Sequence, residues 1–146
     1  MKLLDTEETI VVVTGGTTES NRDRTLALWL QGEIDRRGEG QTYRRAVVTD
    51  DEWYLESRVL QQLTTIAIGG PGVNAVTQQF APDLPTLMSE DERVYVQADL
   101  DADVKRVGLW GADAAATSAA VDAFVVHGHL DELLRRIWRF RSDMLA

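Results

Sequence analysis

The chain has 146 residues and carries 15 Lys and Arg against 24 Asp and Glu, which gives a net charge of −9. This length fits one domain, so we expect residues 1–146 to form a single unit. Cysteine is absent, which excludes disulfides and cysteine-ligated metal. The acidic balance argues against a nucleic-acid partner.

Apolar runs in the sequence are short, and none approaches the roughly 18 residues that a membrane-spanning helix needs. The N-terminus brings acidic residues where a secretion signal needs an apolar stretch. We therefore expect no membrane partner and a cytoplasmic location. Lys2 and Lys105 are the only lysines, and Asp outnumbers Glu. This composition fits either a halophilic protein in high salt or a GC-rich genome that favours arginine.

The first predicted elements are a strand, a polar loop and a helix. Ile10–Thr14 is a β-branched run, which predicts a buried strand. After a glycine-rich loop, Ser20 or Asn21 is expected to cap a helix with apolar residues at every fourth position. Gly38 is expected to end that helix.

The same unit then repeats twice. Arg45–Thr49 predicts a second strand, and the following helix is expected to open at Asp50 and continue as far as Leu63. Thr64–Ile68 predicts a third strand. In the turn after it, Pro71 suits the first position of a helix, which is expected to break near residue 82.

Beyond residue 85 the pattern changes to strict alternation, which predicts a half-exposed strand over Val94–Leu100. Val104–Trp110 is expected to return beside it as a hairpin. Two helices follow, over about Ala114–His127 and Leu130–Arg141. The expected fold is a three-layer α/β domain, Rossmann-like or flavodoxin-like, with a mostly parallel sheet of about five strands.

Three of the predicted strands end in glycine and lead at once into a helix. In parallel sheets, ligands bind outside the carboxyl ends of the strands, and free N–H groups at helix starts attract anions. A small anionic ligand, such as a phosphate group, is therefore expected at this edge. Its candidate ligands are Gly15, Gly16, Thr17, Thr18, Ser20, Asp50, Gly69, Gly70, Asn74, Gly111, Asp113 and Thr117.

Two alternatives stay open at this edge. The glycines can serve only to make the strand-to-helix turns compact, and Asp50 can simply begin the next helix. The phosphate fingerprints of nucleotide-binding folds are missing, because no Gly-Lys-Ser/Thr ending and no GxGxxG run is present. The sequence does not identify a cofactor.

No complete catalytic set emerges from the sequence, so no catalytic residue is assigned. His127, His129 and Asp131 resemble a minimal metal cluster, but a histidine near a helix end is the ordinary explanation, and no metal site is predicted. Trp29 and Trp138 are expected in the core or at a subunit interface. Trp53 and Trp110 are expected in the core or beside a ligand.

Thr65–Thr77 contains an apolar strand followed by Gly-Gly-Pro-Gly-Val-Asn, and Val107–Thr117 contains a strand, a glycine, an acid and a threonine. Both segments resemble a recurring module of archaeal surface-layer proteins. The resemblance implies a non-catalytic α/β module of a surface or interaction protein, and it transfers no catalytic residue.

The C-terminal helix is amphipathic, with an apolar stripe beside arginines, and can dock either on its own domain or on a second copy as a homodimer. Two functions are therefore expected as alternatives. The first is a non-catalytic binding or assembly module. The second is an enzyme or sensor that binds a nucleotide or sugar phosphate at the glycine-rich edge.

Overall fold

The computed structural model describes residues 4–138, apart from the side chain of Glu19. The strands are β1 (Ile10–Thr14), β2 (Ala46–Asp50), β3 (Thr64–Ile68), β4 (Thr86–Glu90), β5 (Val94–Asp99) and β6 (Arg106–Gly111). The helices are α1 (Asn21–Arg37), α2 (Asp51–Glu56), α3 (Ala75–Phe80), α4 (Ala114–Val126) and α5 (His129–Ile137). Strand and helix alternate up to α3, as predicted.

All six strands form one sheet in the order β2-β1-β3-β6-β5-β4. The pairs β1–β2, β1–β3 and β3–β6 are parallel, and β5 runs antiparallel to both β6 and β4. The mostly parallel α/β sheet and the β5–β6 hairpin are therefore confirmed. The predicted number of five strands is wrong, because β4 adds a sixth.

The sixth strand escaped prediction because it buries little: of its five residues only Met88 is partly buried, against a core cluster. β4 pairs only with β5, at one edge of the sheet, and four of its five residues are exposed. Its pairing also shifts register between Thr86 and Met88. A strand held by its neighbour's backbone, with so little burial, shows no hydrophobic alternation in the sequence.

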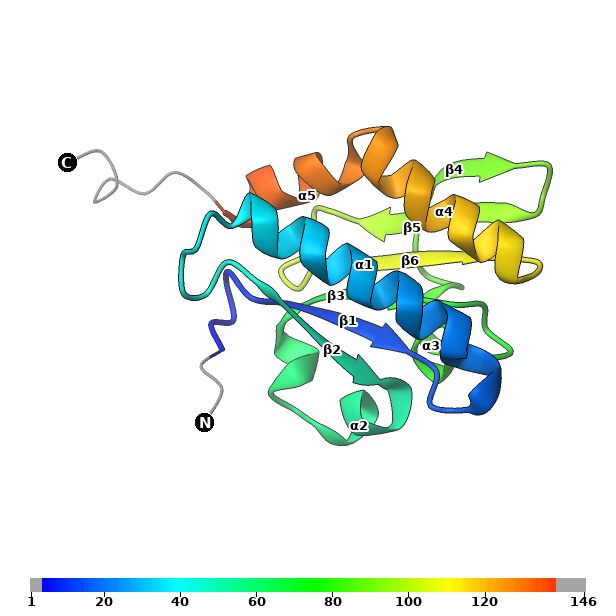
Figure 1. The fold of residues 1–146 in the computed structure, drawn as a ribbon, viewed down its shortest axis with the longest axis horizontal. Coiled ribbons are helices and arrows are strands. Elements are labelled where there is room, and N and C mark those ends of the chain that lie inside the picture. The colour runs from blue at the N-terminus through cyan, green and yellow to red at the C-terminus, as the bar shows by residue number, and fades with distance from the viewer. Residues whose placement is uncertain (1–3, 139–146) are drawn as a thin grey trace.

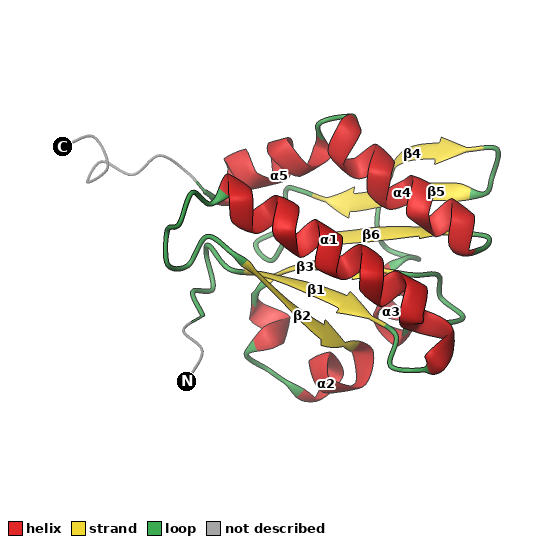
Figure 2. Ribbon diagram, viewed as in Figure 1, coloured by secondary structure: helices red, strands yellow, loops and turns green. Residues whose placement is uncertain are grey.

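The sheet lies between two layers of helices (Figures 1 and 2). Ile10 and Val12 of β1 face one side, where they pack in a core cluster with residues of α1, α4 and α5. Val11 and Val13 face the other side and pack with residues of α2 and α3. All four valine and isoleucine side chains are fully buried, as their continuous β-branched run predicts.

Two helix boundaries differ from the prediction. α1 begins as predicted, with Ser20 at its N-cap position, although the Ser20 hydroxyl donates to the carbonyl oxygen of Val73 and makes no capping hydrogen bond. The helix predicted to continue to Leu63 ends at Glu56, and a separate short 3-10 turn follows over Leu60–Gln62. Pro71 lies in a turn rather than at a helix start, since α3 begins only after its N-cap, Asn74.

The apolar stripe of α5 packs inside its own domain. Leu130, Leu133 and Leu134 are buried in the cluster shared with α1 and α4, and Trp138 packs at its border. The helix is described as far as Ile137, so the rest of the predicted helix, up to Arg141, lies outside the described residues. The stripe is used within the domain, and the homodimer through this helix stays a prediction.

The arrangement of β1 and β3 creates an opening at one end of the sheet. From β1 the chain crosses to β2 on one side, whereas β3 lies on the other side. The loops that follow β1 and β3 therefore diverge at this point, which is where ligands bind in open α/β sheets. The loop after β6 reaches the same edge. Within residues 4–138, no helix has the length and apolar content to cross a membrane.

Candidate functional site

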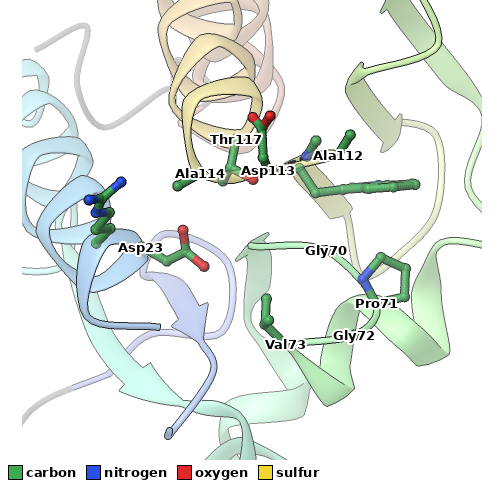
Figure 3. Close-up of a pocket in the computed structure, with 12 residues that line it drawn as sticks. Asp23, Gly70, Pro71, Gly72, Val73, Ala112, Asp113, Ala114 and Thr117 are labelled. Carbon is green, nitrogen blue, oxygen red and sulfur yellow. Dashed lines mark hydrogen bonds between the residues drawn. The ribbon is translucent and has the colours of Figure 1, made fainter. Parts of the chain in front are cut away.

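A cavity of about 350 Å³ lies at the carboxyl ends of β3 and β6, next to the start of α1. It is bounded by the turn after β3, the first turn of α4 and the first turn of α1 (Figure 3). Its lining consists of Arg22, Asp23, Gly70, Pro71, Gly72, Val73, Trp110, Gly111, Ala112, Asp113, Ala114 and Thr117. The volume falls in the range of small-molecule sites.

Asp23 is the most unusual residue of this cavity. It is only 6% exposed, and within residues 4–138 its carboxylate has no hydrogen-bond or ion-pair partner. Figure 3 shows the carboxylate directed into the space between the turn at Gly70 and the first turn of α4. Burial raises the pKa of the Asp23 carboxyl above its usual range. Its oxygens still contact solvent, since neither is among the fully buried atoms that lack a partner. A largely buried carboxylate without a protein partner is a candidate for ligand binding.

Gly69 creates the space that Asp23 occupies. Its φ of +109° lies in a region that side chains rarely adopt, and an added Cβ would lie 2.6 Å from Asp23 Oδ2. The Asp23 carboxylate therefore packs directly against the backbone at Gly69. Glycine is required here for both reasons, so Gly69 supports the cavity from beneath without lining it.

Trp110 forms one wall of the cavity, and it is held on two sides. Its ring stacks on Tyr95 with centroids 4.3 Å apart, and its Nε1 donates to Gln97 Oε1 at 2.8 Å. Gln97 in turn donates to the carbonyl oxygens of Ala81 and Leu84. This wall is fixed before any ligand arrives, as an aromatic binding surface requires.

The start of α4 forms the opposite side of the cavity. Side chains of α4 and its N-cap accept hydrogen bonds from backbone N–H groups there. Asp113 accepts from the N–H of Ala116 at 2.8 Å and pairs with Arg93. The hydrogen bond from Ala116 and the guanidinium of Arg93 both lower the pKa of the Asp113 carboxyl. Thr117 accepts from the N–H of Gly111. A capped helix end offers less to an anion than a free one.

The charges around the cavity favour hydrogen-bond donors over anions. Asp23 and Asp113 place two carboxylates in the lining, of which Asp113 is already paired with Arg93. Arg22 is exposed and supplies the one cation of the lining. A hydroxyl or amino group suits the unpaired Asp23, and an anionic group can be accepted only next to Arg22.

The structure brings four of the twelve predicted ligand residues into this cavity, namely Gly70, Gly111, Asp113 and Thr117. Gly16, Thr17 and Thr18 lie exposed on the neighbouring loop, outside the cavity. The predicted edge of the sheet therefore contains the cavity, but the β1–α1 loop contributes to it less than expected.

Other predicted residues hold the loops together. An added Cβ on Gly15 would lie 1.9 Å from the carbonyl oxygen of Val73, so this glycine permits two loops to touch. Gly111 has the same kind of role, since its Cβ would lie 2.3 Å from that of Ala116. Ser20 is buried against Val73. For Gly15 and Gly111, close packing explains the glycine without a ligand.

Asn74 connects three elements. Its Nδ2 donates to the carbonyl oxygens of Val13 at 3.0 Å and Ile68 at 2.9 Å, at the ends of β1 and β3. Its Oδ1 accepts from the N–H groups of Val76 and Thr77 as the N-cap of α3. All of these bonds are internal, so Asn74 shapes the edge and is not available to a ligand.

Asp50 and Asp51 have structural roles at the start of α2. Asp50 caps the helix by accepting from the N–H of Trp53, which is the alternative left open by the sequence. Asp51 is 8% exposed and accepts from the N–H of Ala75, which links α2 to α3.

The tryptophans divide differently from the prediction. Trp29 is 46% exposed, so it lies outside the core and its alternative place at a subunit interface stays a prediction; Trp53 is 66% exposed. Trp110 lines the cavity, which agrees with the expectation of a place beside a ligand rather than in the core. Trp138 packs against the core cluster and donates from Nε1 to the carbonyl oxygen of Glu8.

Asp23 was missed because an acid in the first turn of a helix is an ordinary feature. A signal was nevertheless present in the spacing. Asp23, Ala27, Leu30 and Ile34 recur at intervals of four, three and four residues, and all four are buried along one face of α1. A charged residue in line with a buried apolar stripe indicates either a partner in the core or a site.

The two histidines lie far from this cavity. His127 is the C-cap of α4, at the opposite end of that helix from Asp113, and His129 begins α5. Among residues 4–138 no group of three His, Asp or Glu side chains is placed to hold a metal ion.

Comparison with protein-family models found no match for this sequence, and comparison with curated proteins found no significantly similar one. The function is therefore argued from the geometry of the cavity.

Proposed function

We propose that this protein is a binding module for a small polyhydroxylated molecule, a sugar or a nucleoside, held in the cavity beside Asp23. The single observation that carries the proposal is the Asp23 carboxylate, which is 6% exposed, faces the cavity and has no partner among the described residues. Hydroxyl groups of a sugar ring would donate to it and satisfy it.

Two further features support this class of ligand. The fixed ring of Trp110 offers a flat apolar wall, against which a sugar or a base can stack. Arg22 belongs to the same lining and is the group that would accept a phosphate on the ligand. The anionic ligand predicted from the sequence would then be a phosphorylated sugar or nucleoside. The hydroxyl groups of that ligand would donate to Asp23.

The Rossmann-like or flavodoxin-like character of the domain belongs to this proposal. It is supported by the strand order β2-β1-β3 and by the cavity at the divergence of β1 and β3. The hairpin half, β6-β5-β4, departs from a doubly wound sheet. The similarity to surface-layer modules stays a prediction, and the Gly-Gly-Pro segment has a local role as the turn that bounds the cavity.

Thermal shift against a defined set of compounds tests the proposal. The set contains adenosine, uridine, glucose and mannose together with their monophosphates. A ligand at about 100 times its Kd stabilises the fold by roughly 2.7 kcal/mol, which is several degrees in a chain of this size. We expect at least one sugar or nucleoside to raise the Tm of the wild-type protein.

Asp23→Asn is the decisive variant, with Asp122→Asn as its matched control on an exposed face of α4. Losing a charged acceptor is expected to weaken binding by about ten- to a hundredfold. Asp122→Asn should bind as the wild-type protein does. A flat screen on folded protein, or equal binding by Asp23→Asn, would contradict the proposal.

A further inference from the structure

The edge of the sheet at β2 pairs with no further strand among the described residues, and the residues of β2 after Ala46 are partly buried. β2 is the terminal strand and pairs only with β1. The carbonyl oxygen of Arg45 accepts from the N–H of Ile10 in β1. Since backbone groups alternate along a strand, those of Ala46, Val48 and Asp50 point away from β1.

Side chains of α1 cover one end of this edge. Asp35 accepts from the N–H of Ala46 at 2.8 Å, and Gln31 donates to the carbonyl oxygen of Ala46 at 3.0 Å. Val48, at the centre of β2, has no such partner among the described residues. An uncovered strand edge is a template for pairing with another strand.

The surroundings of this edge are apolar on both faces of the sheet. Leu28 of α1 is 54% exposed, Trp53 of α2 is 66% exposed and Val59 is 55% exposed. Trp53 and Val48 line surface hollows on both sides of β2, one shared with Leu28 and the other with Val59. Exposed large apolar side chains grouped in this way mark an interaction surface.

The charges along the edge indicate what covers it. Arg24, Leu28, Gln31 and Asp35 recur along α1 at intervals of four, three and four residues, and their contacts place them beside β2. The stripe is basic at one end, apolar in the middle and acidic at the other. A two-fold axis reverses the second copy, which sets Arg24 of one copy opposite Asp35 of the other.

We propose that β2 pairs antiparallel with β2 of a second copy of this chain, around a two-fold axis at Val48. The pairing joins the two sheets into one, satisfies the outward N–H and C=O of Val48 and covers Leu28 and Trp53. The contact is isologous, so it closes after two copies. This dimer uses a different surface from the α5 stripe and from the Asp23 cavity.

Sedimentation equilibrium of the full chain tests the proposal, with Leu28→Glu and Val48→Pro as interface variants. Leu28 is exposed, so a charge there leaves the fold intact. The N–H of Val48 points outward, so proline removes no bond to β1. Val126→Glu is the matched control, because Val126 is 70% exposed on α4, away from β2. Circular dichroism verifies that each variant is folded.

We expect the wild-type protein and Val126→Glu to show twice the 16.3 kDa mass of the chain. Leu28→Glu and Val48→Pro should raise the dimer Kd at least tenfold. A wild-type protein that stays monomeric up to about 1 mM overturns the proposal. A dimer of equal strength in both interface variants also overturns it and places the contact elsewhere.

Discussion

Among single residues, the Asp23 carboxylate carries the proposed ligand binding. Asp23 lies on the buried face of α1, yet no described side chain or backbone group pairs with it. Folding therefore stabilises its protonated form, which is why its pKa is raised. Binding sites commonly retain such locally unfavourable groups because they serve a ligand.

The raised pKa of Asp23 predicts how its replacement depends on pH. An acid with a raised folded pKa binds more protons in the folded state, so stability falls as pH rises from the unfolded pKa through the folded one. Asp23→Asn should therefore stabilise the free protein above this window. We expect a rise of about 2 °C or more in Tm at pH 7, and a smaller rise near pH 4. A variant less stable than the wild-type protein at pH 7 would contradict this prediction.

Alanine substitutions at the two neighbouring glycines after β3 are expected to affect stability differently. At Gly69, an added Cβ meets Asp23 Oδ2 at 2.6 Å in a backbone with positive φ. At Gly70, the nearest atoms lie at 3.6 Å. In urea unfolding, Gly69→Ala should lose about 1–3 kcal/mol, whereas Gly70→Ala should change stability little. Similar losses in both variants would show that the turn is not built as described.

Among the secondary-structure elements, the strands that are buried on both faces could be predicted from the sequence. β1 and β3 match their predicted bounds, because their β-branched runs are continuous. β4 depends on its pairing with β5, which leaves no local pattern. α2 ends before a local turn in which Ser57 Oγ accepts from the N–H of Leu60, a signal that the sequence analysis did not use. The position of the candidate site could be predicted from the carboxyl ends of the strands. Asp23 could not, because an acid in the first turn of a helix is an ordinary feature of a helix start.

Asn74 tests whether the edge of the sheet is held together by one side chain. Its amide joins β1, β3 and α3 through donors and an acceptor that are all buried. Asn74→Asp removes both donors and sets a carboxylate against two carbonyl oxygens. We expect a loss of about 2 kcal/mol or more in urea unfolding. The exposed Asn21 supplies the control, and Asn21→Asp should be close to neutral. Equal effects of the two substitutions would count against this role.

At the scale of the whole molecule, a net charge of −9 on 146 residues sets the response to salt. Mutual repulsion between acids opposes the compact state, and salt screens it. Adaptation to high salt therefore predicts a Tm that rises steadily from low to multimolar KCl in a thermal scan. A Tm that does not change with KCl would favour genome composition as the reason for the arginine-rich, lysine-poor surface.

The sheet of this molecule presents two separate surfaces: a cavity at the divergence of β1 and β3, and an open edge at β2. In the proposed dimer the cavities lie at the carboxyl ends of their own sheets and stay open. Ligand binding and dimer formation are therefore expected to be independent. Leu28→Glu should leave the thermal shift by a bound sugar or nucleoside unchanged.

The most direct test of ligand binding in the Asp23 cavity is an amide NMR titration of the wild-type protein with the sugar or nucleoside that gives the largest thermal shift. We expect saturable shifts of the backbone signals of Asp23, Gly70 and Ala114 and of the Trp110 indole, all of which belong to the cavity. Shifts confined to other surfaces, or no saturable shifts with any compound of the set, would contradict the account.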